Sequence, residues 1–282
     1  MAILLFSLVL VFTVSQSACT KLYHKSGESV IIFNAIKALF SFLPFLIFAF
    51  FGFSFHGATI LYGAIYGVLL CVSMVTGYLA LKSGPMALTS MLVSFSIVIP
   101  IVYGLCVGET LNVFKIVGLC ALVVAMVVVN LNKKSSEGKT SYFRWLLYVA
   151  LTFCANGVLS IIQKIHQTAF PSLYVTEFTT VGMLVCVVFF FVLALIKFKP
   201  SQILKSKGKK FGALAGVFFA VANFCTTFLV GMENASALFP AITAGTLVLN
   251  LVCGLVVFKE KLKINHYVAV VFGVCAVILL KL

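Results

Sequence analysis

Charged side chains are scarce in this sequence, making up 9% of its 282 residues, and aspartate is missing altogether. Arginine and tryptophan each occur once, as Arg144 and Trp145. Soluble domains carry about 25% charged residues. The shortage therefore excludes a cytosolic enzyme, a nucleic-acid-binding module and a receptor with a large soluble domain.

Apolar side chains take the place of the missing charges, at 63% of the residues. A helix needs about 20 apolar residues to cross a bilayer, so this length holds about ten spans. Because backbone polar groups must be paired within hydrocarbon, the spans are expected to be helices. The sequence thus predicts an all-α membrane protein of ten transmembrane helices. The predicted spans are 2–20, 30–51, 57–80, 86–107, 114–131, 145–163, 173–196, 211–231, 237–257 and 265–281.

The net charge of +14 comes mainly from lysines between the predicted spans. The two longest loops, 132–144 and 197–210, are also the most basic. Alternate loops carry 16 Lys and Arg on one side against three on the other. Cytoplasmic loops collect such residues, which predicts both termini outside. The first span lacks a basic leader, so we interpret it as a retained helix and not a signal peptide.

The chain repeats its own pattern, with 1–131 and 145–282 as two five-helix halves joined by the basic linker 132–144. Gly63-x-x-x-Gly67 in the first half is matched by Gly212-x-x-x-Gly216 in the second. An odd number of spans in each half means that the second half is inserted upside down. Inverted repeats of this kind are the framework of many secondary transporters, whose substrate sites lie near the bilayer midplane.

Two further motifs sit at equivalent places in the halves, Gly-Glu-x-Leu at 108–111 and Lys-Glu-x-Leu at 259–262. Small residues also open the fourth and ninth spans, at 83–87 and 234–237. With the five-plus-five layout, these features resemble the EamA-like members of the drug/metabolite transporter superfamily over the whole chain. The resemblance implies a ten-helix carrier of small metabolites such as amino acids. Family members are usually drawn with cytoplasmic termini, which is the reverse of the orientation that the lysine count predicts.

Polar residues inside the spans are the candidate substrate ligands, because each costs a few kcal/mol at the bilayer centre. Lys37 shares one helix face with Asn34 and Ser41. We expect Lys37 to attract an anionic group and Glu177 a cationic one, although Lys37 could instead snorkel to the interface and Glu177 could simply begin a helix. A polar stripe runs through Thr152, Asn156, Ser160 and Gln163. The predicted substrate-binding residues are Gln16, Asn34, Lys37, Tyr78, Asn156, Ser160, Glu177 and Asn223.

Other residue types carry weaker signals. The nine cysteines are scattered singly and are interpreted as small hydrophobes. The four histidines lie near predicted span ends and are expected at the membrane interface. Glu109 and Glu260 are interpreted as structural residues beside helix ends. Neither a catalytic group nor a metal or cofactor site is predicted.

These observations favour a secondary transporter, an exporter or exchanger, that moves a small polar or zwitterionic metabolite by alternating access. The alternative is a carrier or flippase for a nucleotide-linked sugar or a lipid head group. Such substrates favour several basic residues in the pore, and the spans offer only Lys37. A membrane-embedded enzyme is disfavoured by the lack of clustered carboxylates. Proton coupling through Glu177, uncoupled transport, and a monomer or a homodimer all remain open, and the membrane is expected to be a prokaryotic plasma membrane.

Overall fold

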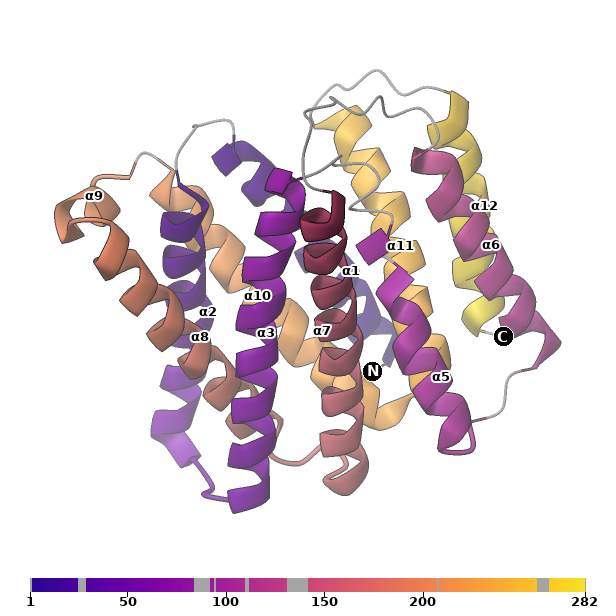
Figure 1. Ribbon diagram of the computed structural model, residues 1–282. Coiled ribbons are helices and arrows are strands. Elements are labelled where there is room, and N and C mark those ends of the chain that lie inside the picture. The colour runs from indigo at the N-terminus through magenta and orange to yellow at the C-terminus, as the bar shows by residue number, and fades with distance from the viewer. Residues whose placement is uncertain are drawn as a thin grey trace. The chain divides into compact units, whose positions relative to one another are not determined.

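A computed structural model describes residues 2–24, 29–83, 92–93, 95–109, 112–130, 142–206, 208–257 and 264–281. Over these ranges the chain forms helices and no strand (Figure 1). The elements are α1 (Ala2–His24), α2 (Val30–Gly52), α3 (Gly57–Ser83), the 3₁₀ helix η1 (Phe95–Ile97), α5 (Val98–Cys106), α6 (Val113–Asn130), α7 (Tyr142–Ala169), α8 (Val175–Lys197), α9 (Pro200–Leu204), α10 (Lys209–Met232), α11 (Ala235–Val256) and α12 (Ile264–Lys281).

Seven stretches of the described helices are long and apolar enough to cross a membrane, which makes this an integral membrane protein. They are Ala2–Tyr23, Val30–Ile47, Gly57–Ala80, Phe143–Ala169, Val175–Lys197, Lys209–Met232 and Ser236–Gly254. Of two shorter apolar helices, Phe95–Cys106 falls within the predicted span 86–107, and Val113–Ala125 begins one residue before the predicted span 114–131. The full set of ten spans stays a prediction.

The helix bounds follow the apolar runs closely, with two differences in the basic segments. Residues 142–144, predicted to end the linker, begin α7, which also runs six residues beyond the predicted end at 163. The predicted loop 197–210 contains the short helix α9, whose first residue Pro200 has a backbone angle suited to that position. The rest of the linker lies outside the described residues.

Two compact units make up the chain. Unit 1 combines Met1–Cys71 with Ile162–Met232, and unit 2 combines Val72–Ile161 with Glu233–Leu282. The division falls inside α3 and α7, so each unit contains segments from both predicted halves. The inverted relation of the halves stays a prediction.

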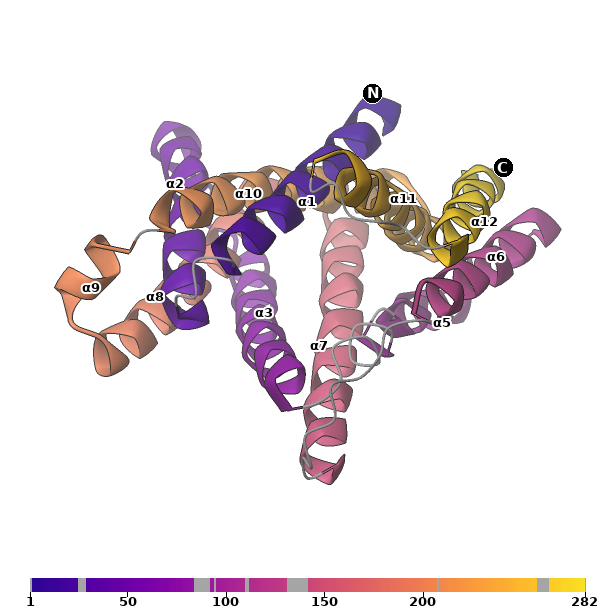
Figure 2. The same cartoon turned by 90° about the horizontal axis from the view of Figure 1, so that it is seen from above.

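In unit 1, α10 packs against both α1 and α2, and α2 packs against α8 (Figure 2). Glycines allow the backbones to touch: a Cβ on Gly216 would lie 2.4 Å from the carbonyl oxygen of Lys37, and one on Gly67 would lie 2.7 Å from that of Gly182. α2 also contains Pro44, which cannot donate a backbone hydrogen bond.

In unit 2, α6 packs against α12, and α11 packs against α12 and α5 (Figure 1). The Glu109 carboxylate accepts a hydrogen bond from Ser236 N at 2.9 Å, in the first turn of α11. Glu109 therefore has the structural contact that the sequence predicts, although the helix it reaches is α11. Glu260 lies outside the described residues.

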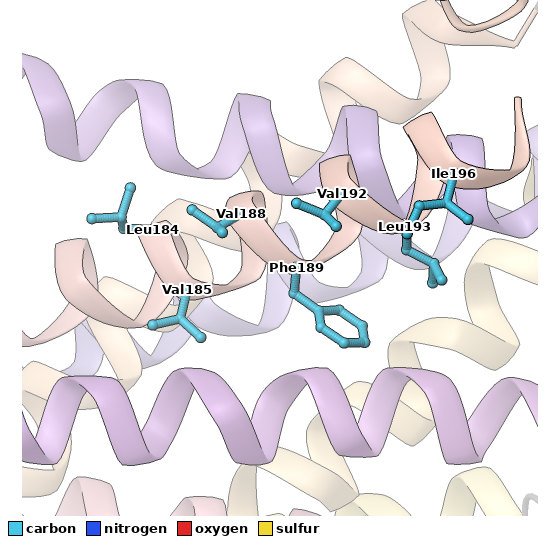
Figure 3. A pocket seen from close by; sticks show the side chains of 7 residues that line it. All are labelled: Leu184, Val185, Val188, Phe189, Val192, Leu193 and Ile196. Atoms are coloured by element: carbon cyan, nitrogen blue, oxygen red, sulfur yellow. The ribbon is translucent and has the colours of Figure 1, made fainter. Parts of the chain in front are cut away.

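The outer face of α8 carries an apolar hollow of about 620 Å³ (Figure 3). Every side chain that lines it is aliphatic or aromatic, and Val188, Val192 and Ile196 are more than half exposed. A face of this kind is suited to lipid. It provides no group that would orient a polar solute, so the candidate site has to be sought among the buried polar residues.

Candidate functional site: a buried polar network in unit 1

Four polar side chains from three helices form a connected network inside unit 1. The Tyr66 hydroxyl of α3 donates to Asn223 Oδ1 of α10 at 2.6 Å. Gln163 Nε2 of α7 donates to the Tyr66 hydroxyl at 3.4 Å and to Thr227 Oγ1 of α10 at 3.0 Å. Thr227 is fully buried, and Tyr66 and Gln163 are 3% and 5% exposed. These polar groups therefore lie buried between helices whose outer faces are apolar.

The hydrogen bonds around this network fix the direction of each amide. Asn223 Nδ2 donates to the carbonyl of Phe219 at 3.0 Å, so Oδ1 must be the atom that accepts from Tyr66. The Thr227 hydroxyl donates its one hydrogen to the carbonyl of Asn223. Both hydroxyls have then used their hydrogens, so both must accept from Gln163, and its Nε2 must face them. Gln163 Oε1 consequently faces away from these partners.

Lys37 of α2 adjoins this network through Phe219. Its side chain is 6% exposed, and Nζ lies 4.1 Å from the centre of the Phe219 ring. The ring face attracts the ammonium, while the Phe219 carbonyl holds Asn223. Among the described residues, no carboxylate pairs with this ammonium. The buried position differs from the snorkelling alternative, in which the amine would reach the interface.

Three other predicted ligands also lie in unit 1. Gln16 of α1 and Asn34 of α2 are half-buried. Glu177 is 8% exposed in the first turn of α8, where its Oε1 accepts a hydrogen bond from Ser54 N at 3.1 Å. Ser54 follows the end of α2 at Gly52, and at about 1.5 Å per residue Lys37 lies about 22 Å from that end. The structure does not bring Lys37 and Glu177 together, and Glu177 anchors the α2–α3 connection instead.

The remaining predicted ligands, Tyr78, Asn156 and Ser160, are half-buried in unit 2. The Ser73 hydroxyl donates to Asn156 Oδ1, which joins α3 to α7. Ser160 donates to the carbonyl of Asn156 in its own helix. One turn before Asn156 in the predicted stripe, Thr152 Oγ1 donates to Thr76 Oγ1 at 2.8 Å. In this unit the stripe forms bridges between helices α3 and α7.

A second polar cluster closes one end of unit 1 around His166, which is fully buried. Gln167 Oε1 accepts from Ser172 N at 3.1 Å, and this contact directs Nε2 toward His166 Nδ1 at 3.0 Å. Nδ1 must then accept, which leaves the hydrogen on Nε2 to be donated to Thr59 Oγ1 at 3.2 Å. His166 thus stabilises the α7–α8 turn from a buried position. The sequence analysis had instead predicted that it lies at the membrane interface.

The network contains residues that the sequence did not single out. Tyr66 carries no distinguishing pattern. Thr227 counts in the sequence only as one polar residue of the predicted span 211–231, and Gln163 only as the last member of the α7 stripe. Two of the cysteines also meet: Cys71 Sγ of α3 lies 3.6 Å from Cys186 Sγ of α8, one turn beyond the Gly67–Gly182 contact. No pattern in the sequence indicates this pairing.

Comparison with known proteins identifies the fold alone. No family model matches the chain, and no curated protein matches it. Solved structures do match; one, described as a crystal structure of a protein, has a TM-score of 0.75 and 17% identity, covering 100% of this chain and 98% of that chain. At this identity the likeness shows a shared helical architecture and carries no information about the substrate.

Proposed function

We propose that this protein is a secondary transporter that moves a small polar metabolite across the membrane by alternating access. The network of Tyr66, Gln163, Asn223 and Thr227, with the buried Lys37 beside it, carries the proposal. Polar side chains within a membrane are costly and face the protein interior or water, where they mark substrate pathways. The buried ammonium of Lys37 lies against the Phe219 ring. Such a group is suited to binding an anionic group that enters from water.

The five-plus-five repeat and the EamA-like motifs support the same proposal from the sequence. In this scheme two inverted halves exchange conformations and open one site to each side in turn. The protein would act as an exporter or exchanger in a prokaryotic plasma membrane, with both termini outside. It would need no catalytic residue and no cofactor, because it transports its substrate unchanged.

Uptake into liposomes tests this proposal. Purified protein is reconstituted and presented with labelled amino acids, hydroxy acids, sugars and nucleotides, with and without a proton gradient. Wild-type protein should transport at least one class, and Lys37→Met should reduce that uptake at least tenfold. Thr179→Val is the matched control, since this buried hydroxyl bonds only to the backbone of its own helix. Equal uptake by wild-type and Lys37→Met vesicles would exclude Lys37 from the site.

The alternative function is a carrier or flippase for a nucleotide-linked sugar or a lipid head group. Lys37 provides one cation for such an anion, and the apolar face of α8 could accommodate an acyl chain. A phosphorylated head group, however, favours several basic ligands. Within the described part of unit 1, Lys37 is the lysine that adjoins the network.

A further inference from the structure

We infer that unit 1 binds an anionic phospholipid along the outer face of α8, with an acyl chain in the apolar hollow and the phosphate head group at Lys197 and Lys199. This lipid is a bound component of the protein's surroundings and not the transported solute, so the inference goes beyond the proposed transport. It rests on the pattern of the lining residues, the depth of the hollow and the charge at its end.

The hollow on α8 is lined by two rows of apolar side chains that run along the helix (Figure 3). The first row is Leu184, Val188, Val192 and Ile196, and the second is Val185, Phe189 and Leu193. Members of a row are four residues apart, which places them above one another on one helix face. At the same spacing the next member of the second row is Lys197, the last residue of α8. A row that lines the hollow therefore ends in a lysine.

The depth of the hollow matches one leaflet of a bilayer. At about 1.5 Å per residue, α8 rises about 20 Å from Leu184 to Lys197. Half of the hydrocarbon core is about 15 Å thick. With Lys197 at the level of the head groups, the lining rows thus extend to about the bilayer midplane. A hollow of about 620 Å³ with only apolar side chains along it is suited to an acyl chain lying lengthwise.

The two lysines lie at a hydrogen-bonded corner between α8 and α9, and both are exposed. Phe198 N donates to the carbonyl of Ala194 at 2.8 Å and ends α8, while Lys199 N donates to Gln202 Oε1 at 3.0 Å and begins α9. Two residues of chain separate the Cα atoms of Lys197 and Lys199 by about 7 Å at most. Both side chains can therefore reach one phosphate group.

The charge around this corner selects the head group. The loop 197–210 carries six lysines, and the sequence has no acidic residue between Glu177 and Glu233. Each lysine near the membrane surface strengthens binding of an anionic lipid about fivefold. A zwitterionic head group brings its own ammonium, which the lysines repel. Charge complementarity thus favours an anionic phospholipid, whose chain the hollow accommodates.

Phosphatidylglycerol and phosphatidylcholine with identical acyl chains test the inference. The purified full-length protein is freed of lipid in detergent and titrated with each. Native mass spectrometry counts the bound lipids, and thermal unfolding reports their affinity, because a ligand stabilises the form that it binds. Phosphatidylglycerol should bind about tenfold more tightly or better. High salt should reduce this preference, since exposed charges are screened.

Variants at the end of the hollow test the head-group contact. Lys197→Gln and Lys199→Gln should each weaken binding of phosphatidylglycerol about fivefold and leave phosphatidylcholine unchanged. Lys115→Gln, in the first turn of α6, removes the same charge from unit 2 and should bind both lipids as wild type does.

Variants along α8 test the acyl-chain contact. Val192→Trp fills the hollow and should weaken binding of phosphatidylglycerol severalfold. Leu195→Trp is its matched control, because Leu195 is 54% exposed against 53% for Val192 and is not one of the residues that line the hollow. All these side chains are partly or fully exposed, so unfolding without lipid should stay near wild type.

Equal affinity of the wild-type protein for the two lipids would overturn the inference. Wild-type binding of phosphatidylglycerol by a protein carrying both Lys197→Gln and Lys199→Gln would do the same. If Val192→Trp binds the lipid as Leu195→Trp does, the acyl chain lies elsewhere and the hollow is not the site.

Discussion

Replacing Gly216 with alanine measures how tightly α10 must approach α2 to form the site. A Cβ at this position would lie 2.4 Å from the Lys37 carbonyl oxygen, 2.8 Å from Phe40 Cβ and 3.0 Å from Ser41 N. Ordinary contacts begin near 3.4 Å, so the helices would have to separate by about 1 Å. None of the three atoms can rotate away, because all belong to the backbone or to Cβ.

The expected loss of stability follows from two opposing contributions. Overpacking of this kind costs up to about 3 kcal/mol. Alanine recovers about 1 kcal/mol because it favours a helix more than glycine does. The net loss of about 2 kcal/mol should lower Tm by about 4–8 °C, using the change per kcal/mol found for large domains.

Circular dichroism of the purified protein in detergent gives the measurement, and Gly52→Ala is its control on α2. A Cβ at Gly52 would meet nothing within 4 Å, so that variant should melt at or slightly above the wild-type temperature. A Gly216→Ala protein that melts within 1 °C of wild type would refute the close approach of α2 and α10.

Three other substitutions test single contacts. Tyr66→Phe removes the 2.6 Å hydrogen bond to Asn223 and should cost about 1 kcal/mol in thermal unfolding; an unchanged Tm would contradict this bond. Glu177→Gln keeps an acceptor for Ser54 N, so its stability and uptake should stay near wild type, whereas Glu177→Ala should lose about 1.5–3 kcal/mol. Abolished uptake in the glutamine variant would instead indicate proton coupling through the carboxylate. Gln167→Leu leaves Ser172 N and the Leu173 carbonyl in the α7–α8 turn without their hydrogen-bond partner, so amide hydrogen exchange in this turn should accelerate severalfold. Unchanged exchange would contradict a structural role of the His166 cluster.

The helices were predictable because apolar runs and their boundaries are local properties of the chain. The prediction of a span over 211–231, for example, differs from α10 by two residues at its start and one at its end. The polar stripe on α7 was also predictable, since spacings of three and four residues place side chains on one helix face. Within the described residues, three of its four members bond to side chains on other helices.

The partners of those polar residues were not predictable, because they depend on which helices pack together. In the sequence, nothing distinguishes Tyr66 from the other aromatic residues of the spans. Its role depends on the packing of α10, which places Asn223 within hydrogen-bond distance of it. Lys37 and Glu177 were assigned to one cavity on charge alone, although they lie at different depths along the helices. The buried place of His166 likewise depends on Thr59 and on the turn that Gln167 organises.

Pro44 gives α2 a mechanical property that its neighbours on the same helix do not share. Proline has no N–H, so the carbonyl four residues earlier, that of Phe40, loses its usual partner within the helix. On the N-terminal side of this gap, Lys37 and Phe40 are fixed against Gly216. On the other side, α2 leads to the connection that Glu177 anchors through Ser54. The missing hydrogen bond therefore lies between two parts of α2 that are held separately, one against α10 at Gly216 and one through Ser54 at Glu177.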